Sequence, residues 1–205
     1  MVPRIGVALG SSAPRLGSTA TCCWGRPLTH KLNIKEPLTL GTTDVSRLVS
    51  PEEFATAMTR RWHSLGNTSS PKLGWLWASM AATFNRTVAE CQTTNHTTWR
   101  VLQPPTGTGK TQGLCVYAAV TIAKNHSAQS PLGILVVTRT IAQADEIVAT
   151  IREQIADPAD AHRVQARHSE AKLQGAAMRA AAVLVITHEA YTRALEGLSQ
   201  DQHGR

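Results

Sequence analysis

The sequence contains no long hydrophobic run, although 42% of its 205 residues are hydrophobic and only 17% are charged. No apolar run reaches the roughly 18 residues that cross a bilayer. The apolar residues 5–9 near the N-terminus form a shorter stretch than the roughly 7–15 residues of a secretory signal. We therefore expect a cytoplasmic chain without a membrane segment, large enough to bury a hydrophobic core.

Cysteine is scarce, and its spacing does not indicate a metal site. The chain has four cysteines, Cys22, Cys23, Cys91 and Cys115, and two of them are adjacent. This usage is typical of free thiols in a reducing cytoplasm. The eight histidines are scattered, and none stands at a spacing from another His, Cys or acid that indicates zinc. We therefore expect no transition metal held by the protein itself.

Acidic residues are few in the first half of the chain. Residues 1–100 contain 11 Lys or Arg against 5 Asp or Glu, whereas residues 101–205 contain 10 against 9. The net charge of +7 is compatible with a polyanionic partner, because bound cations release counterions from it. A solvated surface with a basic tail explains the charge equally well.

The first 96 residues divide into two segments of different character. Residues 1–46 are rich in Gly, Ser, Thr and Pro without a regular period, so we expect an irregular basic segment. Residues 47–96 form the expected helical accessory segment. In it, the sequence SPEE at 50–53 indicates a helix N-cap with a capping box, and Gly66 is expected to end that helix. A second helix is predicted over residues 73–92.

Tryptophan is the prominent aromatic residue of the helical accessory segment. Trp62, Trp75 and Trp77 lie there, close in sequence to Arg60, Arg61 and Lys72. Aromatic rings beside cations can stack on unpaired bases. Packing between helices is the favoured interpretation, because most of these aromatic residues follow helical spacing.

Residues 97–205 alternate between strand and helix. Strands are expected at residues 99–103, 133–138, 163–166 and 182–187, and helices at residues 111–125, 140–155, 171–180 and onward from 188 through 195. The run GILVVT at 133–138 is apolar throughout, as in a parallel sheet covered on both faces. This order predicts a three-layer α/β domain with a parallel sheet and right-handed crossovers.

The sequence PTGTGKT at residues 105–111 stands between a predicted strand and a predicted helix, where a phosphate-binding loop is expected. Two glycines permit backbone angles and close approaches that side chains would block, so amide N–H groups can surround phosphate oxygens. The lysine supplies positive charge to the β and γ phosphates, and the last threonine offers a hydroxyl to Mg²⁺. The helix dipole favours an anion at the same place. The predicted binding residues for ATP and Mg²⁺ are Pro105, Thr106, Gly107, Thr108, Gly109, Lys110 and Thr111, with Lys110 and Thr111 as the expected catalytic residues and Thr111 as the contact to Mg²⁺.

The segment QPPTGTGKT at 103–111 resembles the first motif of superfamily 2 helicases and translocases of the DEAD/DEAH type. Two later stretches, VVTRTIAQ at 136–143 and VLVITHE at 183–189, resemble the family's strand that delivers Thr-Arg onto a helix and its strand that ends in Thr before the acidic box. The resemblance covers about residues 97–197. It implies a partial RecA-like P-loop NTPase domain, preceded by a helical and partly irregular segment. In such motors ATP hydrolysis drives movement along DNA or RNA.

The resemblance also implies a nucleic-acid contact. In family members, residues at the positions of Thr138, Arg139 and Thr187 lie at strand ends and touch the sugar-phosphate backbone of a single strand. Each has a structural alternative, because Arg139 can pair or cap at the surface and Thr187 can cap the following helix.

Several positions depart from the family pattern. Pro104 replaces the usual first glycine of the loop, Gln143 stands one position earlier than in the RNA-helicase branch, and His-Glu at 188–189 replaces that branch's Pro-Gly. The last two departures favour DNA over RNA as the partner. Gln92 and Gln103 are candidates by position alone for reading adenine.

The sequence after Thr187 lacks an Asp-Glu pair. A helicase of this family uses such a pair to order Mg²⁺ and to polarise water. Glu189, Glu196 and Asp201 do not follow a hydrophobic strand in the required way. Family members also need a second RecA-like domain with an arginine finger. We therefore expect a fragment of a longer helicase-like ATPase that binds ATP and hydrolyses it poorly. The alternatives are a noncatalytic nucleic-acid-binding module and another P-loop NTPase.

Overall fold

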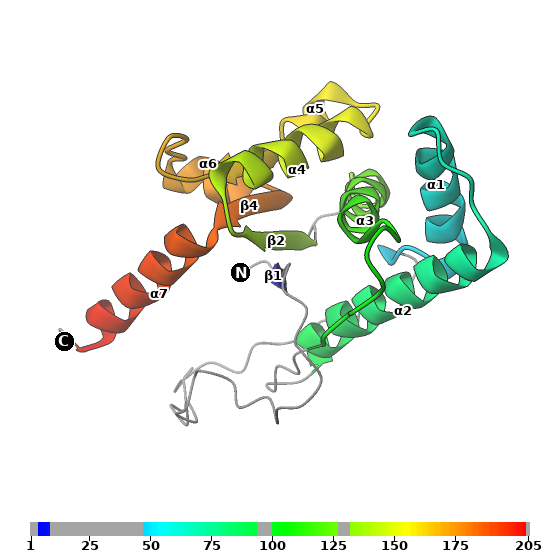
Figure 1. The fold of residues 1–205 in the computed structure, drawn as a ribbon. Coiled ribbons are helices and arrows are strands. Elements are labelled where there is room, and N and C mark those ends of the chain that lie inside the picture. The colour runs from blue at the N-terminus through cyan, green and yellow to red at the C-terminus, as the bar shows by residue number, and fades with distance from the viewer. Residues whose placement is uncertain (1–3, 9–46, 94–99, 127–131, 204–205) are drawn as a thin grey trace.

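The computed structural model describes residues 4–8, 47–93, 100–126 and 132–203. These residues form an α/β protein in which helices pack around a parallel sheet (Figure 1). The helices are α1 (Pro51–Ser64), α2 (Pro71–Thr93), α3 (Lys110–Lys124), α4 (Ile141–Glu153), α5 (Pro158–Ala161), α6 (Gly175–Ala180) and α7 (His188–His203). The strands are β1 (Arg4–Ala8), β2 (Gly133–Thr138), β3 (Val164–Arg167) and β4 (Val183–Thr187). None of the helices in these ranges combines the length and the apolar character needed to cross a membrane.

The sheet has the order β1-β2-β4-β3, and all its strands are parallel. Every residue of β4 is buried, and β2 alternates only between buried and half-buried residues. Helix α4 packs on β2, β3 and β4, and α7 packs on β2 and β4. The apolar run of β2 therefore lies in a covered parallel sheet, and the predictions of a parallel sheet and of a strand at 133–138 are confirmed.

One strand was not predicted, and one predicted strand is wrong. Arg4–Ala8 forms β1 and pairs in parallel with β2, in a segment that we expected to be mostly irregular. Residues 9–46 of that segment lie outside the described residues. The strand expected at 99–103 is absent from residues 100–103, and Trp99 is not described. A strand exists only where a neighbour pairs with it, and the described sheet pairs β1, β2, β4 and β3 without residues 100–103.

Helices α1 and α2 share one hydrophobic core with the strand-helix part of the chain. Phe54, Met58, Trp77 and Met80 belong to the same buried cluster as residues of α3, α4, β2 and β4. The predicted capping box is present at the start of α1, where the backbone N–H of Glu53 donates to the Ser50 hydroxyl. The helical accessory segment therefore contributes directly to the core.

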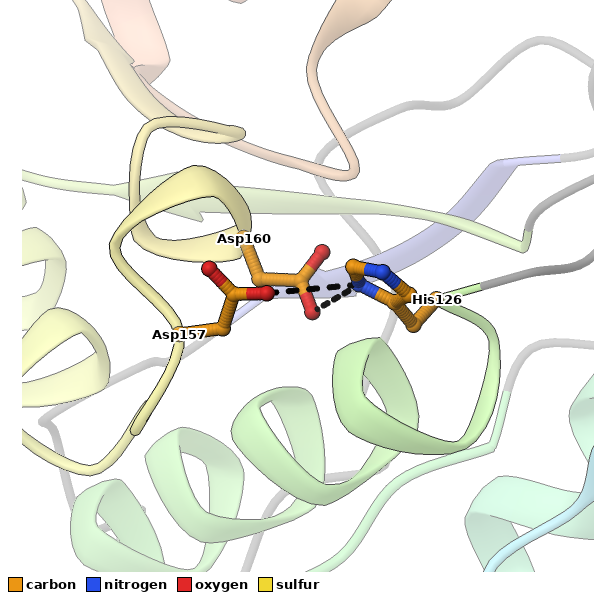
Figure 2. A group of neighbouring side chains, drawn as sticks. All are labelled: His126, Asp157 and Asp160. Carbon is orange, nitrogen blue, oxygen red and sulfur yellow. Dashed lines mark hydrogen bonds and ion pairs between the residues drawn. The ribbon is translucent and has the colours of Figure 1, made fainter.

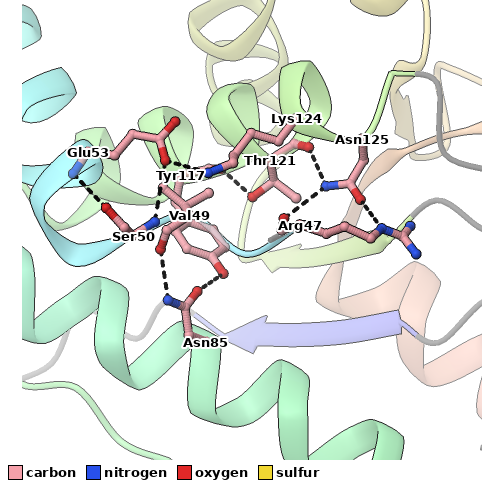
Figure 3. A network of polar contacts seen from close by, with 9 residues as sticks. All are labelled: Arg47, Val49, Ser50, Glu53, Asn85, Tyr117, Thr121, Lys124 and Asn125. Carbon is pink, nitrogen blue, oxygen red and sulfur yellow. Dashed lines mark hydrogen bonds and ion pairs between the residues drawn. The ribbon is translucent and has the colours of Figure 1, made fainter. Parts of the chain in front are cut away.

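A polar network ties the segment before α1 to α2 and α3 (Figure 3). The Asn85 side chain donates to the carbonyl oxygen of Val49 at 2.8 Å and accepts from the Tyr117 hydroxyl at 2.8 Å. Arg47 donates to Asn125 at 3.0 Å, next to the end of α3. These contacts hold α1, α2 and α3 in a fixed arrangement, which sets the position of the loop that precedes α3.

Candidate phosphate-binding site

The loop before α3 has the backbone geometry that its glycines predict. Gly107 and Gly109 both have φ of 81°, and among the described residues no other type than glycine has positive φ. A side chain in this left-handed region costs about 1–2 kcal/mol. Gly109 is the N-cap of α3, which begins at Lys110. The two glycines are therefore required by the turn that leads the chain into the helix.

The N-terminus of α3 offers hydrogen-bond donors to an anion. No side chain caps it at Gly109, so its first N–H groups lack the partner that a capping residue would provide. The Lys110 ammonium lies across the loop and donates to the carbonyl oxygen of Pro104 at 3.0 Å. Thr111 follows in the first turn of α3 and is half-buried. The lysine, the threonine and the helix N-terminus therefore lie together at the start of α3.

Two tryptophans hold the loop from behind. The indole N–H of Trp77 donates to the carbonyl oxygen of Thr108 at 3.1 Å. A Cβ added to Gly109 would lie 2.9 Å from the ring of Trp62, whose centroid is 5.8 Å from that of Trp77. The sequence identified these aromatic residues as core residues without linking them to the loop. Trp75 differs from both, because it is 81% exposed.

The residues expected to contact nucleic acid lie at the carboxyl ends of β2 and β4. Thr138 and Thr187 are register partners, with exposed fractions of 2% and 8%. The Thr138 hydroxyl donates to the carbonyl oxygen of Thr140 at 3.2 Å. The Thr187 hydroxyl accepts from the N–H of Ala190 at 3.3 Å, within the first turn of α7. Arg139 is exposed. Thr187 therefore caps the following helix, which is the structural alternative to a nucleic-acid contact.

The structure does not bring this strand end together with the loop. Arg61 donates to Gln112 at 3.1 Å and forms an ion pair with Glu153 at 3.0 Å, so the start of α3 lies beside the end of α4. The start of α4 follows Arg139. Because α4 has 13 residues, its two ends are about 20 Å apart at 1.5 Å per residue. The loop and Arg139 thus lie toward opposite ends of α4.

The acids and glutamines considered in the sequence lie elsewhere. Glu189 is exposed on α7 and pairs with Arg193 at 2.5 Å. Glu196 is also exposed on α7, and Asp201 lies further along this helix. Gln103 is exposed before the loop, and Gln92 lies near the end of α2. Within the described ranges no ion pair involves Lys110, so its ammonium is not neutralised by a described carboxylate.

Two titratable side chains of α3, Cys115 and Tyr117, are buried in the core. Burial raises the pKa of the Cys115 thiol to about 12, so the thiol stays protonated near neutral pH. Burial also raises the pKa of the Tyr117 hydroxyl well above its ordinary value. Both groups therefore serve the core, and the chemistry of this site belongs to the loop.

No protein-family model matches this chain, no curated protein matches it, and no solved structure matches it. The geometry of the loop and the chemistry of its residues are therefore the evidence on what this chain binds.

Proposed function

We propose that this chain binds the triphosphate of a nucleotide, together with Mg²⁺, at residues 105–111. One observation carries the proposal. The uncapped N-terminus of α3 follows two glycines of positive φ, and the ammonium of Lys110 lies over the same loop. Backbone N–H groups at a helix N-terminus and a lysine are the donors that phosphate oxygens require.

Each residue has a defined role in this proposal. The amides from Thr106 to Gly109 surround the β-phosphate. Lys110 exchanges the carbonyl oxygen of Pro104 for phosphate oxygens, and the Thr111 hydroxyl contacts Mg²⁺ bound to the nucleotide. The exposure of residues 105–107 leaves the outer side of the loop open to a ligand.

The resemblance of QPPTGTGKT to the first helicase motif supports a finer proposal. The chain is then the ATP-binding portion of a superfamily 2 helicase or translocase, with a RecA-like fold and a nucleic-acid partner, DNA rather than RNA. Exposed Arg139 and the net charge of +7 support the polyanionic partner. Hydrolysis requires an acid that orders Mg²⁺ and water. Glu189, Glu196 and Asp201 do not follow a hydrophobic strand as that acid does in family members, so we expect binding with slow turnover.

Equilibrium binding of a fluorescent ATP analogue to the full chain, with and without Mg²⁺, tests the proposal. Lys110→Met keeps the alkyl chain and removes the ammonium. We expect it to weaken binding by about 10- to 100-fold, because a charge-assisted hydrogen bond contributes roughly 1.5–3 kcal/mol. Lys172→Met is the matched control, because Lys172 is exposed and lies outside the loop. Equal affinities of Lys110→Met and the unmodified chain would contradict the proposal.

A second measurement separates the motor from a noncatalytic nucleic-acid module. Binding of single-stranded DNA is measured across salt concentrations, with and without the ATP analogue. A motor segment is expected to change its DNA affinity with nucleotide, because the two ligands are coupled. Salt-sensitive DNA binding that responds neither to nucleotide nor to Lys110→Met supports the module instead.

A further inference from the structure

Three potential metal ligands converge where α3 ends and α5 begins, in the part of the chain that the structure describes. They are His126, Asp157 and Asp160, and one ligand atom from each lies within 4.8 Å of the others. In Figure 2 both carboxylates point toward the imidazole ring. The His126 Nδ1 atom lies 2.8 Å from Oδ2 of Asp160 and 3.8 Å from Oδ2 of Asp157. The geometry therefore groups one nitrogen and two oxygen donors.

Among the described residues, the hydrogen bonds around this cluster leave one carboxylate oxygen, Oδ2 of Asp157, without a donor. Asp157 is the N-cap of α5, and its Oδ1 accepts from the N–H of Ala159 at 2.8 Å. Its Oδ2 faces His126 at 3.8 Å, which is too long for a hydrogen bond. The Nδ1 atom carries at most one proton, and Asp160 is the nearer acceptor. The Asp157 carboxylate is thus directed at a ring nitrogen of His126 that already pairs with Asp160.

The cluster also brings two carboxylates close together. Asp160 has a side chain that is only 6% exposed, and its Oδ1 pairs with Arg163 at 3.2 Å. Two carboxylates therefore share the guanidinium of Arg163 as the nearby arginine charge. Like charges close together disfavour one another, and a bound cation reverses that effect. A divalent cation between the three donors would bind the free oxygen of Asp157 and compensate both carboxylates.

We propose that His126, Asp157 and Asp160 bind a divalent metal ion of the zinc class. An imidazole nitrogen with two carboxylate oxygens suits Zn²⁺ or Co²⁺, whereas Mg²⁺ and Ca²⁺ favour oxygen donors alone. The side chains of His126 and Asp157 are 55% and 48% exposed, so an ion can enter and water can complete its coordination. Buried Asp160 provides the fixed ligand. The metal joins the end of α3 to α5, directly before β3.

This site is independent of the nucleotide proposal. His126 lies beyond the last residue of α3, and the phosphate-binding loop precedes the first. The 15 residues of α3 separate the two by about 22 Å. The sequence alone did not indicate the site, because His126 and Asp160 are 34 residues apart. The sequence Asp-Pro-Ala-Asp at 157–160 was the available signal, since it places two carboxylates at one helix start.

Titration of the tag-free full chain with Co²⁺, followed by visible absorption, tests the proposal, with Zn²⁺ as the competitor. We expect one equivalent to bind saturably and to raise the thermal unfolding midpoint. Asp157→Asn and His126→Gln are each expected to weaken binding by more than about tenfold, because even outer-shell changes reach that range. Asn is as good an N-cap as Asp, so Asp157→Asn should keep α5 folded.

Two control variants remove the same chemical groups elsewhere. His63→Gln changes an exposed histidine that contacts Ser69, and Glu189→Gln changes an exposed carboxylate on α7. Both should bind Co²⁺ with unchanged affinity. Absence of saturable binding would overturn the proposal. So would unchanged affinity in both Asp157→Asn and His126→Gln, or an equal loss in the controls, because the metal would then bind elsewhere.

Discussion

Gly107 and Gly109 share the same φ of 81° but differ in their surroundings. Substituting each one therefore separates the backbone strain of a side chain from its steric overlap with neighbours. Apart from its chain neighbours, no described residue has an atom within 4 Å of a Cβ added to Gly107, whereas a Cβ on Gly109 would meet Trp62 at 2.9 Å. We expect Gly107→Ala to lower the free energy of unfolding by about 1–2 kcal/mol through backbone strain alone. Gly109→Ala should cost more, because Trp62 must also move. Urea denaturation measures both, and equal losses would show that Trp62 yields freely.

Cys115 predicts how stability depends on alkaline pH. Burial raises the pKa of its thiol to about 12 in the folded chain, whereas an exposed thiol titrates near pH 8.5. Above about pH 9 the unfolded chain has therefore lost a proton that the folded chain keeps. The free energy of unfolding should fall by about 1.4 kcal/mol per pH unit from this group. The stability that the protonated Cys115 thiol contributes is fully present below the pKa of the thiol in the unfolded chain. It is lost as pH rises toward the pKa of the thiol in the folded chain.

Cys115→Ala should flatten the decline in stability between about pH 9 and pH 10, which urea denaturation at both values measures. Tyr117→Phe is the matched variant, because the pKa of Tyr117 is also raised by burial but its removal leaves the thiol in place. An identical pH dependence in Cys115→Ala and the unmodified chain would show that the thiol is not protected by folding.

The sequence predicted individual residues best where the required conformation is local. The positive φ of the two loop glycines and the cap at Ser50 follow from rules that involve only a few neighbours along the chain. Predicting which way the tryptophans point requires knowing the direction of each residue around the helix axis. Trp75 and Trp77 are two positions apart, so they point to different sides of α2, and only Trp77 is buried. The contact of Trp62 with Gly109 depends on tertiary packing, which no local rule provides.

At the scale of elements, helices were predicted better than strands. The cap at Ser50, the positive φ of Gly66 and the apolar face of α4 are encoded within single segments. A strand forms only when a neighbouring strand pairs with it, and the sequence does not identify that neighbour. For this reason β1 was not predicted and residues 100–103 were wrongly predicted as a strand. Helix α5 has four residues, which is too short for a hydrophobic period to identify.

The elements around the loop also explain why the candidate site was only partly predictable. Its donors belong to one continuous segment, but its support comes from α1 and α2, through Trp62 and Trp77. The cluster of His126, Asp157 and Asp160 needs the ends of α3 and α5 to meet, because His126 and Asp160 are distant along the chain. Sequence motifs identify contiguous donors, and only the fold identifies donors from different elements.

At the scale of the whole molecule, the buried cluster that joins α1 and α2 to the sheet predicts cooperative unfolding. Met58 on α1 is fully buried and belongs to the same cluster as Val185 of β4. We expect Met58→Ala to cost roughly 2–5 kcal/mol, because it leaves a cavity in this core. If the core is one unit, the opening free energy that amide hydrogen exchange reports for β4 should fall in this variant. It should fall by the same amount as the free energy of global unfolding that tryptophan fluorescence reports.

Leu195→Ala is the control for this prediction. Leu195 is 48% exposed on α7, and surface substitutions typically change stability by less than about 0.5 kcal/mol. Full protection of β4 in Met58→Ala, alongside a shifted fluorescence transition, would mean that α1 and α2 unfold separately from the sheet. Since Trp62 and Trp77 contact the loop at residues 105–111 from those helices, such a result would also mean that this loop loses its support before the sheet unfolds.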